Sequence, residues 1–357
     1  MPPIMGAAAF IMAQMLAIPY IQICLYASIS AVLYYLAIFY TVDLEAAKYG
    51  LKGEAKEDLP KKSAVLKKTY LFLPILILLY LLIVGYSPLY ACSWCILFSI
   101  LISLTNPGIR EKFFTVFTEC MISGAKNAAM VAAALAGVGI IVAVITHTGI
   151  GLRFASLLIY LSGGHLILAM FLIAIGALIL GTGVPTTAAY ILSVLLGGRA
   201  LIALGVIPMA AHLFCFYFAI ISEVTPPVAL CAYAGASIAG GNPVKTGYEA
   251  FKLSIAGFII PFIFVFHPGL LLHGSLFEIL SAIAIGVLVS FLASSIVQNY
   301  YGGRYLNIWG RFLLFIIVIL VIGNSTFFFL VGILFFILFI LGRIAFFSKK
   351  IDLPKQI

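Results

Sequence analysis

Long apolar runs separated by short polar breaks recur along almost the whole chain, and they restrict the folds open to it. Hydrophobic residues make up 64% of the 357 positions and charged residues only 9%, whereas an ordinary soluble domain carries about 25% charge. We infer that the chain is solvated by lipid. Lipid offers no partner for backbone polar groups, so each run is expected to be a helix. The runs predict helices at 20–42, 70–86, 88–105, 128–147, 165–181, 208–222, 228–240, 244–267, 275–298, 312–323 and 325–342.

The basic residues suggest how these helices are oriented in the membrane. The one long hydrophilic segment, 43–69, is rich in lysine, and the positive-inside rule places it in the cytoplasm. Alternating sides along the chain then places four further loops in the cytoplasm, at 106–127, 240–252, 299–311 and 343–357. All basic residues except Arg153 and Arg199 fall in these five segments. The net charge of +9 therefore reflects membrane orientation and not nucleic-acid binding. We expect a multi-pass protein of the cell (plasma or inner) membrane with a cytoplasmic C-terminus.

This topology sets a condition on two segments. The assignment takes residues 165–196 as a re-entrant hairpin rather than two full spans. Residues 208–240 must form one span that is interrupted in its middle. Both segments carry helix-breaking residues where the turn or the interruption has to lie.

The expected hairpin tip is Gly181-Thr182-Gly183-Val184-Pro185-Thr186-Thr187. Glycine permits turns that other residues resist, and Pro185 cannot donate a backbone hydrogen bond. At membrane depth such backbone is tolerated only where it is buried in protein or lines a wet cavity. Freed carbonyls and threonine hydroxyls suit a small hard cation, and the exposed N–H groups of a half-helix favour an anion. We expect an ion and substrate site here, with a plain helix kink as the alternative.

The expected interruption of 208–240 is Glu223-Val224-Thr225-Pro226-Pro227. Its two prolines remove two backbone donors, which leaves carbonyls one turn earlier without partners. Glu223 is the only carboxylate in the middle of a predicted span, and ionisable groups at that depth are usually functional. It could coordinate a cation, carry a coupling proton or pair with a polar neighbour. His212, on the entering half-helix, is expected to be a hydrogen-bonded packing residue and not a ligand.

A weak internal repeat accompanies these breaks. The N-terminal Met-Pro-Pro-Ile resembles Thr-Pro-Pro-Val at 225–228, and both are followed by a small-residue apolar helix. The same offset of 224 residues relates Pro2 to Pro226 and Pro19 to Pro243. On the predicted topology the two copies run in opposite directions, which is the inverted-repeat architecture of many secondary transporters. The first-copy prolines, Pro2 and Pro3, are therefore candidate site residues, unless the likeness is coincidental.

The second copy has a hairpin and an entering half-helix before its Pro-Pro break, whereas the chain opens inside the first broken helix. We therefore expect an incomplete first repeat, whose missing first half is supplied by another polypeptide or has been lost by truncation. The expected divisions are the end of the first repeat (1–42), a cytoplasmic loop (43–69), two spans with an interfacial amphipathic helix (70–127), the second repeat (128–273) and additional transmembrane helices (274–357).

Several motifs resemble the large membrane subunit of tripartite ATP-independent periplasmic (TRAP) transporters, in the fused form that works with TAXI-type binding proteins. They are Gly-Thr-Gly-Val-Pro-Thr-Thr-Ala-Ala-Tyr at 181–190, His-Leu-Phe-Cys-Phe-Tyr-Phe from His212, and Val-Thr-Pro-Pro-Val-Ala-Leu from Val224. The resemblance covers roughly residues 1–275 and is specific through 181–273.

The resemblance implies an all-α polytopic carrier of the elevator type. A soluble extracytoplasmic protein of the TAXI type would deliver an organic acid, and a sodium gradient would usually drive its uptake. No cofactor is expected besides Na⁺ as coupling ion. The family pattern puts the second hairpin tip at Gly181, Thr182, Gly183, Pro185, Thr186 and Thr187. The facing break, at Thr225, Pro226 and Pro227, would share a sodium ion with the tip through oxygens of Gly181, Thr182 and Thr225. Glu223 matches no ligand of the family.

Three other functions stay open at this point. An intramembrane enzyme is not expected, because no His-Glu-x-x-His, Gly-x-Ser-x-Gly or paired intramembrane aspartates occur. A carrier of another inverted-repeat family, such as an ion–proton exchanger, would need no soluble binding protein. A non-transporting remnant would follow from the missing first half. The sequence names no substrate and does not decide between Na⁺ and H⁺ coupling.

Overall fold

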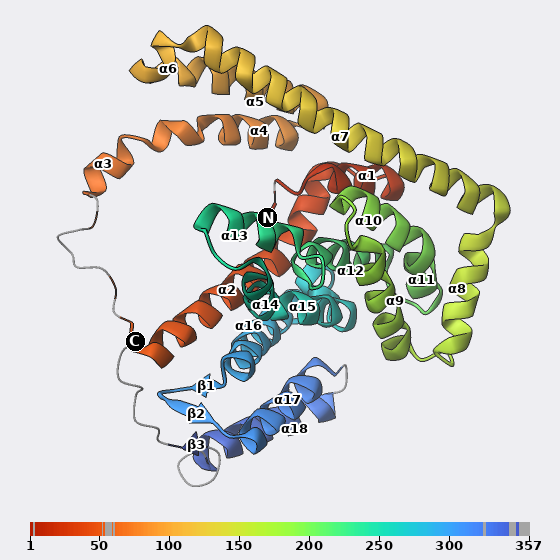
Figure 1. The fold of residues 1–357 in the computed structure, drawn as a ribbon. Coiled ribbons are helices and arrows are strands. Elements are labelled where there is room, and N and C mark those ends of the chain that lie inside the picture. Colours follow the sequence, from red (N-terminus) through yellow and green to blue (C-terminus); the bar gives the residue numbers. More distant parts are fainter. Residues whose placement is uncertain are drawn as a thin grey trace. The chain divides into compact units, whose positions relative to one another are not determined.

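The computed structural model describes residues 1–2, 4–51, 53, 59, 61–323, 326–342 and 348–349. The chain divides into two compact units (Figure 1), each described here by itself. The large unit comprises Met1–Pro2, Leu25–Lys52 and Ile141–Ile357, and the small unit comprises Pro3–Cys24 and Gly53–Ile140.

The helices, in chain order, are α1 (Ala7–Leu16), α2 (Tyr20–Tyr49), α3 (Lys62–Leu66), the 3₁₀ turn η1 (Thr69–Phe72), α4 (Leu73–Val84), α5 (Pro88–Ser103), α6 (Pro107–Glu111), α7 (Phe113–Thr148), α8 (Ile150–Leu161), α9 (Leu166–Gly181), α10 (Thr186–Ser193), the π-helical turn η2 (Val194–Gly198), α11 (Arg199–Ala203), α12 (Pro208–Ile221), the 3₁₀ turn η3 (Ser222–Val224), α13 (Leu230–Ala239), α14 (Pro243–Leu253), α15 (Ile255–Phe266), the 3₁₀ turn η4 (Pro268–Leu271), α16 (Leu276–Gln298), α17 (Ile308–Ile322) and α18 (Thr326–Gly342). The strands are β1 (Tyr300–Tyr301), β2 (Arg304–Leu306) and β3 (Ser348–Lys349).

Four helical segments of the described chain are long and apolar enough to cross a membrane, and several shorter apolar helices accompany them. The four are α2, the continuous segment Thr186–Ala203 formed by α10, η2 and α11, the segment Pro243–Phe266 formed by α14 and α15, and α16. This inventory is that of a multi-pass membrane protein.

In the small unit, α4 and α5 pack against each other. Gly85 ends α4 in the left-handed conformation, which glycine adopts at little cost. Ser87 then caps α5, its Oγ accepting the Tyr90 N–H at 3.4 Å, with Pro88 at the first helical position, where its missing N–H costs nothing. The unit's buried cluster includes Ala9 of α1 and Leu82 of α4.

In the large unit, α12 is the central helix, buried along most of its length. It packs against α9, α10 and α15. Aromatic rings fill the space between them: the Phe214 and Phe262 centroids lie 5.5 Å apart, and those of Phe171 and Phe262 lie 4.9 Å apart. Figure 1 shows α12 enclosed by these helices. These aromatic contacts fix the positions of α9 and α12, the helices that lead into the expected tip and the expected break.

A second set of contacts joins α2 to α16 within the large unit. The Thr41 hydroxyl donates to Ser294 Oγ at 3.0 Å, and Gly286 leaves room for the side chain of Leu33, which a Cβ there would overlap. α16 begins with a capping box between Ser275 and Glu278, an arrangement that satisfies two otherwise free N–H groups.

The C-terminal part of the large unit is a short three-stranded sheet and a pair of packed helices. β1 and β2 form an antiparallel hairpin with Tyr300 opposite Tyr305, and β3 pairs antiparallel with β2. α17 and α18 lie side by side (Figure 1). Apart from this small sheet, the described chain is helical, as the sequence predicts.

The predicted helices at 70–86, 88–105, 165–181, 208–222, 228–240, 275–298 and 325–342 are confirmed to within a few residues. Three boundaries were wrong. The helix predicted to end at Val42 continues to Tyr49. The Glu, Ala and Lys residues after Val42 favour helix even where the chain is no longer buried in the membrane. The amphipathic segment before 128 and the span after it are one helix, α7.

The third error concerns a glycine. The second hairpin arm was predicted to end at residue 196, but the helix continues to Ala203 through η2. Gly197 is needed there because a Cβ would collide with Ile173, so this glycine serves packing and not a turn. The predicted helix 244–267 is present as the segment Pro243–Phe266, with Ser254 as a one-residue irregularity between α14 and α15. Two helices, α8 and the short α3, were not predicted at all.

Candidate functional site

The predicted hairpin tip is a turn between two apolar helices. α9 ends at Gly181 and α10 begins at Thr186, so the helical pairing stops over the predicted stretch. Gly183 has φ 77°, a conformation that side-chain-bearing residues rarely adopt. Pro185 precedes the first turn of α10 with φ −57°, which matches the fixed φ of proline. The C-terminus of one helix and the N-terminus of another therefore meet at the tip.

The predicted break in 208–240 is also present. α12 gives way to the 3₁₀ turn η3, the chain is extended at Thr225, and the Pro226–Pro227 peptide bond is cis. The next helix begins only at Leu230. Pro226 and Pro227 occupy the positions three and four residues after Glu223, so neither can donate a helical hydrogen bond to the Glu223 carbonyl.

The tip and the break are in direct contact. Gly181 lies so close to Ser222 that a Cβ at position 181 would overlap the serine side chain. The Thr186 hydroxyl donates a hydrogen bond to Glu223 Oε1. These contacts join residues from the two interruptions that the sequence marks separately.

Glu223 also reaches the helix that follows the break. Cys231 of α13 donates from Sγ to Glu223 Oε2 at 3.3 Å. Within the part of the chain that the structure describes, the one ion pair is Lys252–Glu249, so the half-buried Glu223 carboxylate is held by a hydroxyl and a thiol and faces no cation. Of the three roles considered for Glu223, the pairing with polar neighbours is therefore observed. Cation coordination and proton carrying stay hypotheses.

Other hydroxyls at the break bond locally. Thr225 Oγ1 donates to the Ile221 carbonyl at 2.8 Å, and Ser222 Oγ donates to the Ala219 carbonyl at 2.7 Å. At the tip, Thr182 Oγ1 donates to the Ile179 carbonyl at 2.7 Å. Each hydroxyl keeps its lone pairs available as acceptors or ligands. The Pro227 carbonyl accepts from Tyr233 Oη at 2.5 Å, which ties the break to α13.

His212 is a packing residue, as predicted. It is buried, and its Nδ1 lies 2.8 Å from the Tyr190 hydroxyl of α10. This hydrogen bond joins α12 to the second hairpin arm. Thr187, also predicted at the tip, is buried.

Within its described residues, the structure gives no contact between the other site residues and two of the predicted ones. Pro3 lies outside the described residues. For Pro2, no hydrogen bond in the described structure links it to the tip or the break. Conversely, Ser222 and Cys231 contact the site although sequence reasoning missed them. Ser222 directly precedes the predicted break, but the position of Cys231 across the prolines gave no signal.

A cation at this place would have to be bound mainly by carbonyl and hydroxyl oxygens. No cluster of three or more His, Cys, Asp or Glu side chains that could hold a metal occurs within the described ranges. Carbonyl, carboxylate and hydroxyl oxygens are the ligands that hard cations prefer.

A family model described as Tripartite ATP-independent periplasmic transporter, DctM component, matches residues 1–279. The chain belongs to this family. The DctM match includes both the hairpin tip and the helix break. It makes the chain a permease component of a TRAP transporter. DctM is a family of transporters and not of enzymes. DctM-family permeases generally work with a solute-binding protein and a small membrane component. No curated protein and no solved structure matches the chain.

Proposed function

We propose that the chain takes part in sodium-coupled uptake of an organic acid, which an extracytoplasmic TAXI-type binding protein delivers. The observation that carries the proposal is the contact between the two interruptions, through Gly181 with Ser222 and Thr186 with Glu223. In secondary transporters, discontinuous helices of this kind hold the substrate and the coupling ion near the bilayer midplane.

The contact of the tip with the facing break supports a re-entrant hairpin. The first arm, α9, has 16 residues, or about 24 Å at 1.5 Å per residue. The second, Thr186–Ala203, has 18 residues, or about 27 Å. The second arm is by itself long enough to cross a membrane, but the tip contacts Ser222 and Glu223, at the interruption in the middle of the facing segment 208–240. We therefore place the tip inside the membrane.

Local geometry supports the internal repeat, and we propose that its copies are inverted, as in an elevator-type fold. α1 and α13 each have 10 residues. Each ends at a residue in the left-handed conformation, Ala17 with φ 54° and Gly240 with φ 66°. A proline, Pro19 or Pro243, then precedes or begins the next helix. We propose that 128–273 is the second repeat and that Pro2 and Pro3 belong to the equivalent break of the first.

The tip offers complementary places for a cation and an anion. The C-terminal end of α9 and the freed carbonyl of Glu223 present partial negative charge, which favours Na⁺. We propose that oxygens of Gly181, Thr182 and Thr225 complete the sodium site. The N-terminal end of α10 presents N–H groups, which favour a carboxylate of the substrate. The unpaired charge of Glu223 adds to the attraction for the cation.

The test is an uptake assay in proteoliposomes with the complete natural gene product, including whatever is encoded next to this chain, and its binding protein. We expect labelled organic acid to accumulate only when the binding protein is present and a sodium gradient is directed inward. Accumulation without the binding protein would indicate a carrier of another type. Accumulation driven by a proton gradient alone would refute sodium coupling, and no accumulation of any organic acid would refute transport.

The orientation can be tested separately. We propose an inner-membrane location with the C-terminus and the lysine-rich segment 43–69 in the cytoplasm. A reporter fused after Ile357 that is active only in the cytoplasm should be active in intact cells. Activity of a reporter that functions only outside the cytoplasm would contradict this orientation.

A further inference from the structure

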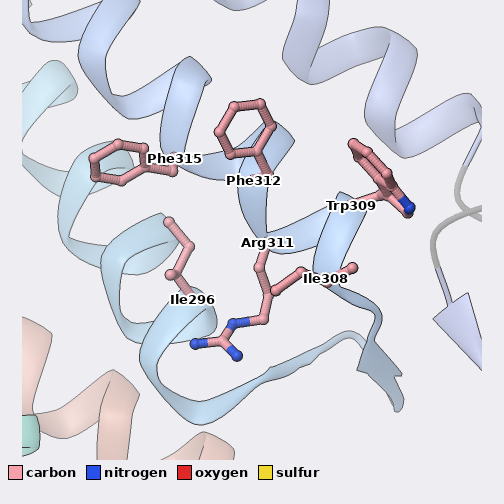
Figure 2. A pocket seen from close by; sticks show the side chains of 6 residues that line it. All are labelled: Ile296, Ile308, Trp309, Arg311, Phe312 and Phe315. Atoms are coloured by element: carbon pink, nitrogen blue, oxygen red, sulfur yellow. The ribbon is translucent and has the colours of Figure 1, made fainter.

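We propose that a groove between the end of α16 and the start of α17 binds an anionic phospholipid. The groove has a volume of about 370 Å³ and is lined by Ile296, Ile308, Trp309, Arg311, Phe312 and Phe315 (Figure 2). It lies beyond residue 279, where the DctM match ends, so the family does not account for it. The proposal does not depend on the proposed transport function.

The walls of the groove suit an acyl chain. Five of its six lining residues are apolar or aromatic, and four of them are strongly exposed: Ile308 70%, Trp309 68%, Phe312 57% and Phe315 52%. In a membrane protein, apolar side chains that are exposed in this way face lipid. Trp309 is of the residue type that gathers where acyl chains meet headgroups.

Arg311 supplies a positive charge that no described residue neutralises. Its Nε is buried without a hydrogen-bond partner, the ion pair found within the described chain lies elsewhere, and none of the six lining residues is acidic. Figure 2 shows the guanidinium pointing away from the rings of Phe312 and Phe315. An unpaired, partly buried guanidinium is costly, and a phosphate offers it two parallel hydrogen bonds.

The fold places this charge at the end of the apolar segments. Asn307 caps α17, with its side chain accepting the Gly310 N–H at 2.8 Å, and Arg311 lies in the first turn, its N–H bonded to the Asn307 carbonyl at 3.1 Å. The short β1–β2 hairpin connects this turn to α16. An apolar groove with one cation at its end is complementary to an amphiphile with an anionic head.

An anionic phospholipid is favoured over a zwitterionic one because only a headgroup with a net negative charge compensates the positive charge of Arg311. One basic residue at an anionic surface contributes about 1 kcal/mol, equivalent to a preference of roughly fivefold. The chain has two tryptophans, so Trp94→Phe leaves Trp309 as the single reporter in the groove.

The experiment measures quenching of Trp309 fluorescence by brominated phosphatidylglycerol and by brominated phosphatidylcholine, with the full chain in vesicles. We expect phosphatidylglycerol to quench at a several-fold lower mole fraction. Arg311→Gln should remove the difference, and Arg311→Lys should keep much of it because the charge remains. Arg110→Gln, which removes an exposed arginine of α6, is the matched control and should change nothing.

Equal quenching by the two lipids in the parent protein would overturn the proposal, even if the Arg311 variants failed to fold. An unchanged preference in folded Arg311→Gln protein would also overturn it. Loss of the preference in the presence of millimolar inorganic phosphate at constant ionic strength would assign the site to a free anion and so reject the lipid.

Discussion

Thr186, at the tip of the hairpin, donates a hydrogen bond to the carboxylate of Glu223, at the break of the facing helix. The same carboxylate accepts from Cys231 on the helix beyond the break. The side chain of Glu223 thus joins the break to α10 and α13, two helices to which no helical hydrogen bond connects it. If the tip opens and closes over a substrate, as the proposed function requires, a contact of this kind would hold the closed tip and could be exchanged for an ion.

Removing the hydroxyl of Thr186 is expected to loosen the tip. Hydrogen bonds to charged groups contribute about 1.5–3 kcal/mol, so Thr186→Val should lower the uptake rate by roughly tenfold or more. Thr186→Ser keeps the hydroxyl and should stay near the parent rate. Uptake in proteoliposomes, normalised to the amount of inserted protein, measures both. Equal rates for the two variants would show that the contact has no role in transport.

Replacing Glu223 distinguishes its three possible roles. Glu223→Gln keeps an oxygen that accepts from Thr186 but removes the charge, so a cation-attracting role predicts a rise of several-fold in the Na⁺ concentration for half-maximal uptake. A purely polar role predicts no change in this concentration. A proton-carrying role predicts uptake that no longer responds to a proton gradient.

Glu223→Asp serves as the control for that substitution. It keeps the charge and shortens the side chain, and it should preserve the Na⁺ dependence better than Glu223→Gln does. The reverse order would mean that the reach of the side chain to Thr186 matters and its charge does not.

Cys231 is a natural reporter of the site. It is an exposed free cysteine bonded to Glu223, so we expect Na⁺ and substrate to slow its alkylation by a maleimide several-fold. Peptide mass spectrometry measures the rate, with the exposed Cys120 of the small unit as internal control. Equal effects of Na⁺ on both cysteines would place ion binding elsewhere.

The close approach of Gly181 to Ser222 predicts a size limit. Gly181→Ala inserts a methyl group against the serine side chain, and overpacking of this kind costs about 1–3 kcal/mol. We expect a lower melting temperature and partial recovery in the double variant with Ser222→Gly. Thermal unfolding in detergent measures both, by a method whose signal does not depend on labelling of cysteines.

Gly176 of the same helix provides the comparison, because a Cβ there would meet nothing within 4 Å. Gly176→Ala should leave the melting temperature unchanged or raise it slightly, since alanine favours helix. If both alanine variants unfold alike, packing at the tip is not the cause.

Features that act through the nearest neighbours in the chain could be predicted from the sequence. The hairpin tip and the break were both located correctly because Pro185, Pro226 and Pro227 remove donors whatever surrounds them. Boundaries set by polarity were less accurate. The residues after Val42 and before 128 were assigned to a loop and an interfacial segment, yet α2 and α7 run through them. Charged side chains place this part of a helix in water instead of lipid, but they do not break its backbone hydrogen bonds.

The amino-acid order alone determined that this chain consists of membrane helices with two interruptions, because lipid forces apolar backbone to pair with itself and proline prevents that pairing locally. Only the tertiary structure decided which groups meet: Ser222 against Gly181, Thr186 and Cys231 on Glu223, and Arg311 unpaired in an apolar groove. The contacts of Gly181 and Thr186 join positions far apart in the chain, and that of Cys231 crosses the break. These contacts depend on how α9, α10, α12 and α13 pack, and no local pattern records that packing.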